Sequence, residues 1–107
     1  MDDEKACIVL NTCPNMAVAQ SMGSQLVESG LAACVNIIPG IVSIYRWQGE
    51  VQKDEEVLLV IKSSTASYSM LEAAIKKDHP YELPEIVCVS IETGLPEYLA
   101  WISENTK

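Results

Sequence analysis

Residues suited to catalytic chemistry are scarce in this 107-residue sequence. It has a single histidine, His79, and its five glycines are scattered singly, so it contains no glycine-rich phosphate-binding loop. Nucleophilic catalysis needs a nucleophile, a base and an orienting group within reach of each other. His79 directly precedes Pro80 at the expected end of a helix, and the run Ser63-Ser64-Thr65 is better explained as a helix cap. We therefore expect a protein that is not an enzyme and that carries no organic cofactor.

Long apolar segments are also missing, and we expect no leader sequence. No stretch approaches the ~20 apolar residues that span a membrane, and the start of the chain lacks the basic residues and apolar run of a secretory signal. Lys and Arg number 7 against 15 Asp and Glu, which gives a formal net charge of −8. Phosphate backbones and anionic membranes are bound through clustered Lys and Arg. We expect a cytoplasmic protein with neither nucleic acid nor a membrane as partner.

The four cysteines form no Cys-x-x-Cys pair, and thiols in the cytoplasm stay reduced. Cys7, Cys34 and Cys88 lie in apolar, strand-like runs, where we expect them to pack as small hydrophobic side chains. Cys13 differs because it lies where a strand gives way to a Pro-Asn turn. It is therefore the cysteine that we consider as a candidate ligand.

The most informative segment runs from Ala32 to Gly49. It is rich in β-branched and aromatic residues, which predicts one very long strand of about sixteen residues and roughly 50 Å. A domain of about a hundred residues has a radius of gyration near 13 Å, so this strand should extend beyond its own domain. Pro39 cannot donate to a ladder, which places the strand at a sheet edge with a bulge or bend at Pro39-Gly40. Because a long apolar edge strand favours association, we predict an obligate oligomer.

The remaining elements complete an α+β fold. Four apolar runs have the composition of strands: residues 6–12, 32–47, 56–62 and 85–92. Apolar stripes at helical spacing predict a helix after Pro14-Asn15 and another after Ser63-Ser64-Thr65, and Pro96 opens a short C-terminal helix. The acidic run Asp54-Glu55-Glu56 is expected to be a solvated strand end.

The element order β-α-β-β-α-β is the split βαβ arrangement of ferredoxin-like folds. Right-handed crossovers then place the first and third strands in the centre of an antiparallel sheet, with the long second strand and the fourth at its edges. A flavodoxin-like parallel sheet is the alternative, but residues 48–56 are too few for the helix that it needs. We expect residues 1–107 to form one domain.

Three motifs resemble those of the CutA divalent-ion tolerance proteins. They lie in one register from about Ile8 to Ile102: Ala33-Cys34-Val35-Asn36-Ile37 with Pro39-Gly40, Ser43, Tyr45, Trp47 and Gly49; Pro80-Tyr81-Glu82 with Pro84-Glu85-Ile86; and Tyr98-Leu99-Ala100-Trp101-Ile102. The resemblance implies a homotrimer built from extended edge strands and terminal elements. It also implies binding of divalent cations, copper foremost, and a role in tolerance to them.

Four aromatic residues are the predicted interface anchors of this trimer: Tyr45, Trp47, Tyr98 and Trp101. The last two belong to the dense apolar face of the C-terminal helix. That face packs either on its own domain or as a clasp on a neighbouring subunit, and the resemblance favours the clasp. The resemblance further suggests that Tyr81 and Glu82 line a cleft between subunits.

A metal site is arguable where the first strand ends. In the expected topology this end lies beside the start of the fourth strand, so Cys13 approaches the segment 78–85. Thiolate and imidazole suit copper, and imidazole with carboxylate suits zinc. Cys13, His79 and Asp78, or Glu85 in place of Asp78, are the candidate ligands for copper or another divalent cation.

The resemblance sharpens this hypothesis and also qualifies it. Copper ligands in similar bacterial proteins are associated with a cysteine and a pair of histidines, and the matching positions here hold Asn11 and Asp78-His79. Cys13 lies two residues beyond Asn11, and two residues along a strand return to the same face. We therefore expect a shifted site in which Cys13 replaces the missing thiol.

Two classes of function remain open. The favoured one is a cytosolic homotrimer that binds divalent cations without turnover. The alternative is a trimeric signalling or scaffold module whose inter-subunit clefts bind a small effector or a partner protein, by analogy with trimers of the nitrogen-regulatory PII type. The long basic loop of those trimers has no counterpart between Trp47 and Val57. A small hydrolase is the least favoured, since a base is lacking.

Overall fold

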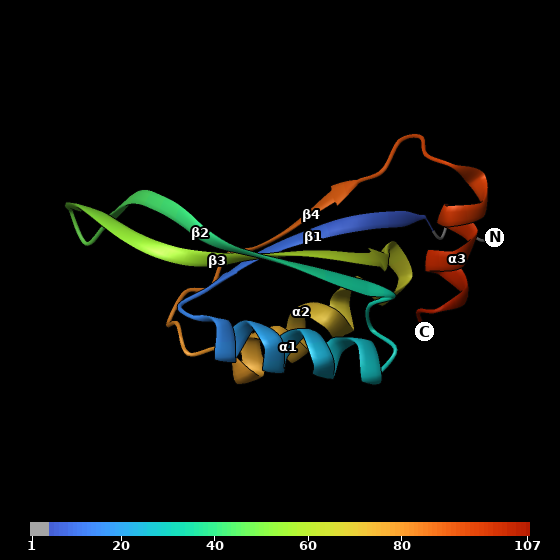
Figure 1. The fold of residues 1–107 in the computed structure, drawn as a ribbon, viewed down its shortest axis with the longest axis horizontal. Helices are drawn as coiled ribbons and strands as arrows, with labels where there is room; N and C mark the ends of the chain where they lie inside the picture. The colour runs from blue at the N-terminus through green and yellow to red at the C-terminus, as the bar shows by residue number, and fades with distance from the viewer. Residues whose placement is uncertain (1–4) are drawn as a thin grey trace.

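The structure is a computed structural model that describes residues 5–107. Four strands form one antiparallel sheet in the order β2-β3-β1-β4: β1 (Ala6–Cys13), β2 (Cys34–Trp47), β3 (Glu50–Ser64) and β4 (Ile86–Ser90). Helices α1 (Met16–Glu28) and α2 (Tyr68–Asp78) cover one face of this sheet, and α3 (Pro96–Glu104) lies at the end that carries the N-terminus (Figure 1). The predicted ferredoxin-like fold, with the second and fourth strands at the edges, is confirmed. No helix among the described residues has the length and apolar character needed to cross a membrane.

The core lies between the sheet and the two helices α1 and α2. Every second residue of β1 and β3 faces these helices, because side chains alternate along a strand. The buried apolar side chains come from all four elements: Cys7, Val9, Leu59 and Ile61 from the strands, and Met22, Leu26, Leu71 and Ile75 from the helices. α1 begins at its N-cap Asn15, whose side chain accepts a hydrogen bond from the Val18 amide at 2.9 Å, as the sequence predicts.

Beyond the end of β1, strands β2 and β3 continue alone as a protruding hairpin. The last β1–β3 pair is Cys13 with Val57, whereas β2 and β3 stay paired as far as Trp47 and Glu50. The hairpin closes in a two-residue turn, in which Gln48 and Gly49 both have positive φ. It gives the molecule a longest dimension of 45 Å against 25 and 22 Å (Figure 1).

The register of β2 shifts between Ile38 and Ile41, where Gly40 has a φ of +77°. The predicted bulge at Pro39-Gly40 and the edge position are therefore confirmed. β3 is longer than predicted, because its polar first half, which carries no apolar signal, forms a ladder with β2.

The predicted serine caps of the second helix are wrong. Ser63 and Ser64 belong to β3, since the β1–β3 pairing runs as far as Ala6 and Ser64. The Ser63 hydroxyl donates to the carbonyl oxygen of Leu31 at 2.7 Å, and α2 begins at Tyr68, after a turn of 3-10 helix, without a side-chain cap. Pairing of the whole strand outweighs the local capping signal.

The short helix α3 packs on its own domain and still leaves an aromatic surface. Ile102 is buried, while the rings of Tyr98 and Trp101 stack at a centroid distance of 5.6 Å and remain about two-fifths exposed, at 40 and 41 %. Ile102 therefore packs on its own domain, whereas Tyr98 and Trp101 are left for the expected clasp on a neighbouring subunit. The expectation that Cys88 packs as a buried hydrophobic residue is wrong for the single chain, because β4 is an edge strand and Cys88 is exposed.

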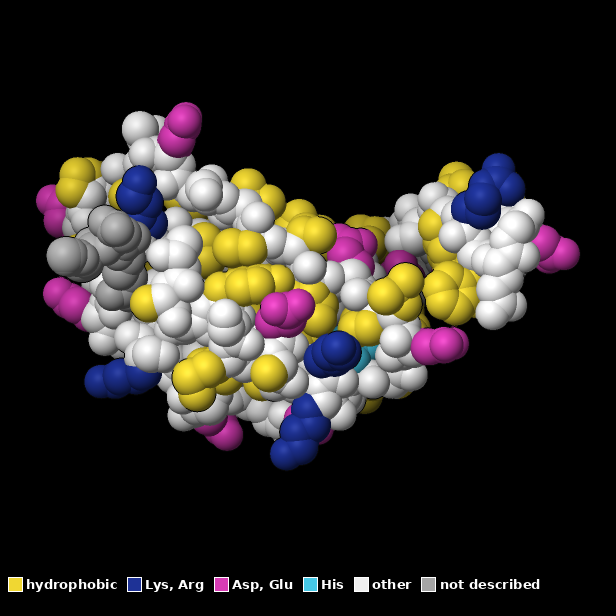
Figure 2. Space-filling model, turned by 180° about the vertical axis from the view of Figure 1, so that it is seen from behind, with side chains coloured by type: hydrophobic (Ala, Val, Ile, Leu, Met, Phe, Trp, Pro, Cys, Tyr) yellow, Lys and Arg dark blue, Asp and Glu magenta, His cyan; other side chains and the backbone are white. Residues whose placement is uncertain are grey.

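Within residues 5–107, no layer covers the sheet face opposite α1 and α2. The register places a set of apolar side chains there, all partly or largely exposed: Ile8, Leu10, Ile38, Leu58, Val60, Val87 and Val89. We call this set the open face. Figure 2 shows hydrophobic side chains gathered across the middle of the molecule, up to the base of the protruding hairpin. An apolar surface of this extent in one chain indicates an association site.

Candidate functional site

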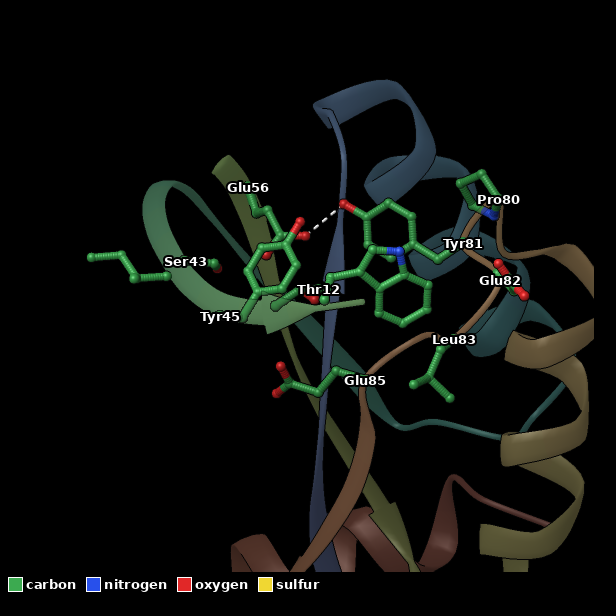
Figure 3. Close-up of a pocket in the computed structure, with 11 residues that line it drawn as sticks. Thr12, Ser43, Tyr45, Glu56, Pro80, Tyr81, Glu82, Leu83 and Glu85 are labelled. Atoms are coloured by element: carbon green, nitrogen blue, oxygen red, sulfur yellow. Dashed lines mark hydrogen bonds between the residues drawn. The ribbon is translucent and has the colours of Figure 1, made fainter. Parts of the chain in front are cut away.

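A cleft of about 670 Å³ opens beside the base of the hairpin (Figure 3). One wall is the hairpin, with Ser43, Tyr45 and Trp47 on β2 and Glu56 on β3. The opposite wall is the connector between α2 and β4, residues 80–85. Pockets that bind small molecules are typically ~300–1,000 Å³ in volume, so this cleft has the size of a ligand site.

His79 fastens the connector to the end of β1. Its Nε2 lies 2.8 Å from the carbonyl oxygen of Thr12, and its Nδ1 accepts a hydrogen bond from the Tyr81 amide at 3.1 Å. Because a carbonyl can only accept, Nε2 carries the proton and Nδ1 is the acceptor. Both ring nitrogens of this buried histidine are therefore used within the chain. The arrangement directs the Tyr81 ring toward the hairpin (Figure 3).

The electrostatic centre of the cleft is Glu56, whose side chain is only 9 % exposed. The Tyr81 hydroxyl donates to Glu56 Oε2 at 2.5 Å, and the Tyr45 hydroxyl donates to a carboxylate oxygen of Asp54. Burial, followed by the bond to Glu56, raises the pKa of Tyr81, while the bond to Asp54 is the main cause that raises the pKa of Tyr45. Both phenols therefore stay protonated, with their O–H groups directed at carboxylates.

The cleft lining is acidic and aromatic. It includes three carboxylates, Glu56, Glu82 and Glu85, but contains no Lys, Arg or His. In the described part of the chain no Lys, Arg or His forms an ion pair with Glu56. The surface thus offers negative charge and aromatic rings to a ligand.

The end of β1 lies beside the connector, as predicted, but the candidate ligands do not converge on one point. Cys13 is buried, and its thiol lies 3.5 Å from Asn11 Oδ1, to which it donates. Asn11 Nδ2 in turn donates to the carbonyl oxygen of Glu85 at 2.8 Å. The expected approach of the β1 end to the connector is correct, and Asn11 and Cys13 do share a face.

The expected ligands nevertheless differ in surroundings. Burial, with a smaller contribution from the Glu56 charge, raises the pKa of the Cys13 thiol to about 11. Asp78 is exposed in a shallow groove beside α1 that Ala17 and Gln25 also line. Within residues 5–107, no three His, Cys, Asp or Glu side chains lie close enough to hold a metal ion. The site formed by Cys13, His79 and Asp78 stays a prediction.

The role of Glu56 was not predicted, because this residue was expected to lie in a solvated acidic run. The available signal was the strand period. Asp54 and Glu56 are two residues apart and pair across the hairpin with Ser43 and Ile41, on the face that also carries Tyr45. The contact with Tyr81, 25 residues away, has no local signature.

The topology, the protruding hairpin and the cleft define a small ferredoxin-like domain with an exposed apolar sheet face and a concave site beside its hairpin. The profile of the CutA1 divalent ion tolerance protein family matches residues 7–105, and the chain belongs to this family. It is 52 % identical over 99 residues to the divalent-cation tolerance protein CutA of Thermus thermophilus, with 92 % of this chain and 96 % of that protein covered.

Other relatives are longer or are known as structures. The chain is 43 % identical to mouse Protein CutA over 96 residues, which are 90 % of this chain but 54 % of the mouse protein. The solved structure of the Thermus thermophilus divalent cation tolerance protein superposes with a TM-score of 0.93 at 50 % identity, covering 95 % of this chain and 99 % of that one. CutA1 from Oryza sativa gives 0.93 at 37 % identity, covering 96 % and 94 %.

Proposed function

We propose that this chain acts as a cytoplasmic homotrimer that binds divalent cations, copper foremost, and contributes to tolerance of them without turning over a substrate. Family membership supports the tolerance role, since the relatives bear that name. The observation that carries the proposal is the combination of an uncovered apolar sheet face and a protruding hairpin in one chain. The two surfaces differ in shape and position, which bears on the number of subunits.

A contact between two different surfaces is head-to-tail, and such contacts close into a ring when the rotation allows it. A hairpin that reaches onto the open face of the next copy is satisfied in a closed ring, and we propose a ring of three subunits. A reciprocal twofold dimer, in which each hairpin lies on the open face of the other copy, is the alternative that the measured mass distinguishes. The four predicted anchors Tyr45, Trp47, Tyr98 and Trp101 are 36–41 % exposed in the single chain and are available for burial.

Light scattering coupled to gel filtration tests the assembly. We expect a single species of three times 11.7 kDa at micromolar concentration. A species of monomer mass at that concentration would refute the trimer.

For the cation, we propose Cys13, His79 and Asp78 as ligands, at a cost that the structure specifies. His79 must release either the Thr12 carbonyl or the Tyr81 amide, and Cys13 must lose a proton held at a pKa of about 11. Metal binding and deprotonation of a thiol are coupled, so affinity should rise with pH. We therefore expect this site to have a lower affinity for the cation than a site with preorganised ligands.

Calorimetric titration with copper tests this ligand set. Cys13→Ser and His79→Ala should each lower the affinity, whereas Cys88→Ser, which removes an exposed thiol, is the matched control. Equal affinity in the wild type, Cys13→Ser and His79→Ala would exclude these ligands while leaving the trimer untouched.

A second function has its own supporting observation, which is the cleft. A trimeric module that binds a small effector needs a concave site with polar groups directed into it, and the cleft between the hairpin and the connector is such a site. A tight ligand of the cleft in metal-free protein would favour this function.

A further inference from the structure

We propose that the cleft between the hairpin and the connector binds a small alkylammonium ion, held by the Glu56 carboxylate and by the faces of Trp47, Tyr45 and Tyr81. The inference rests on the second function proposed above, the effector-binding module, and it names the chemical class of the effector. Three observations carry it: the size of the cleft, its uncompensated charge and its aromatic walls.

The size of the cleft and the spread of its carboxylates favour an organic cation over a bare metal ion. A volume of about 670 Å³ fits a molecule of several non-hydrogen atoms. Glu56 and Glu85 come from different elements and, with Glu82, they do not converge into a group that could hold a metal. In Figure 3 the Glu82 carboxylate lies on the connector side and Glu85 lies below Tyr45, so the charges surround the cleft.

The charge of the cleft selects a positively charged ligand. Glu56 is more than nine-tenths buried, and one of its oxygens, Oε2, accepts the Tyr81 O–H. In residues 5–107 its other oxygen has no hydrogen-bond or ion-pair partner. Within residues 5–107 no buried side-chain oxygen lacks a partner, so this second oxygen is open to solvent, and an ammonium group that donates to it would form a charge-assisted hydrogen bond. An anionic ligand would be repelled by all three carboxylates.

The aromatic walls suit a cation that also has an alkyl part. The hydroxyl groups of Tyr45 and Tyr81 already donate to Asp54 and Glu56, so these residues offer ring faces to a ligand. Ring faces attract cations and also bury methylene groups. A primary ammonium has three N–H donors, enough for Glu56 and a second oxygen acceptor. An alkylammonium combines these properties, whereas a neutral polyol lacks the charge.

Tryptophan fluorescence provides a direct test. The chain has two tryptophans, and Trp47 lines the cleft while Trp101 lies on α3. Trp101→Phe therefore leaves Trp47 as the single reporter. The metal-free trimer of this variant, kept in chelator, is titrated with 1,4-diaminobutane and separately with the neutral 1,4-butanediol. We expect a saturable change in Trp47 emission with the diamine and none with the diol.

Matched variants separate the cleft from the general acidity of the surface. Glu56→Gln in the same background should weaken diamine binding at least tenfold. Glu55→Gln removes the same charge from the adjacent exposed position and should leave the affinity unchanged. Circular dichroism establishes that each variant is folded, and light scattering establishes that each has the mass of the unsubstituted protein.

The proposal is overturned by either of two results in folded protein. One is the absence of a saturable diamine signal, including the case in which a neighbouring subunit already fills the cleft. The other is an equal loss in Glu55→Gln and Glu56→Gln, which would mean non-specific attraction to acidic groups. Neither result affects the trimer mass or the copper titration, so this proposal and the metal-binding function fail separately.

Discussion

Replacing His79 by alanine should destabilise the protein whether or not metal is present. The imidazole links α2, the connector and β1 through its contacts with Thr12 and Tyr81. Each hydrogen bond contributes about 1 kcal/mol net, and a buried backbone group left without a partner costs ~1–3 kcal/mol. The ring also packs on Tyr81, with centroids 4.7 Å apart. Together these losses predict a decrease in the free energy of unfolding of about 3 kcal/mol.

Thermal unfolding in chelator, at one fixed protomer concentration, measures this change. A loss of 1 kcal/mol lowers the Tm of a domain of about a hundred residues by roughly 4 °C or more, so we expect a decrease of about 12 °C. Asp78→Ala is the control, because Asp78 is adjacent but exposed. A Tm for His79→Ala within about 2 °C of the wild type, by the same relation, would refute the structural role of the imidazole. A decrease that appears only when copper is added would assign His79 to the metal instead.

Three further predictions concern assembly, pH and copper. Trp47→Ala should weaken the trimer by about 2 kcal/mol or more, and Val51→Ala, just beyond the hairpin turn, by less; equal dissociation on dilution would contradict this. The pKa of Cys13 is raised from 9.0 to about 11, so its contribution to stability is complete below pH 9 and is lost as the pH rises toward 11. Cys13→Ala should flatten the decline in stability measured by denaturant titration over that range, and an unchanged slope would exclude the effect. Asn11→Cys should raise the affinity for Cu(I), because thiolate is the softer donor, and should rescue Cys13→Ser if the ligand role has shifted. Failure to rescue, measured by competition with a copper chelator, would end the shifted-site hypothesis.

Features governed by backbone geometry could be predicted from the sequence. Pro39 cannot donate to a ladder, and this alone placed β2 at the edge of the sheet and located the bulge. Asn15 marked the start of α1 for an equally local reason, since its side chain accepts a backbone amide bond. These properties hold before any tertiary contact is made.

Features that depend on tertiary contacts could not be predicted. The polar first half of β3 has no apolar pattern and becomes a strand because β2 lies opposite it. Glu56 appears as one acid among three in sequence, whereas in the fold it is buried and accepts a hydrogen bond from Tyr81, 25 residues away. His79 looked like a free ligand, but its two hydrogen-bond partners are a carbonyl 67 residues away and an amide two residues on. The sequence shows that the chain is acidic, but it does not show which carboxylate is buried at the cleft.

The bulge in β2 also determines which side chains of the hairpin lie on the face of the cleft. Between the pairs Ile38–Leu58 and Ile41–Glu56, β2 has one residue more than β3. Side chains alternate along a strand, so this extra residue decides which face every later side chain of β2 occupies. If Gly40 instead took its place in a regular ladder, without the bulge, Ile44 and Arg46 would stand where Tyr45 and Trp47 now stand. The chemistry of the cleft, aromatic or basic, is thus determined by whether one residue of β2 is bulged.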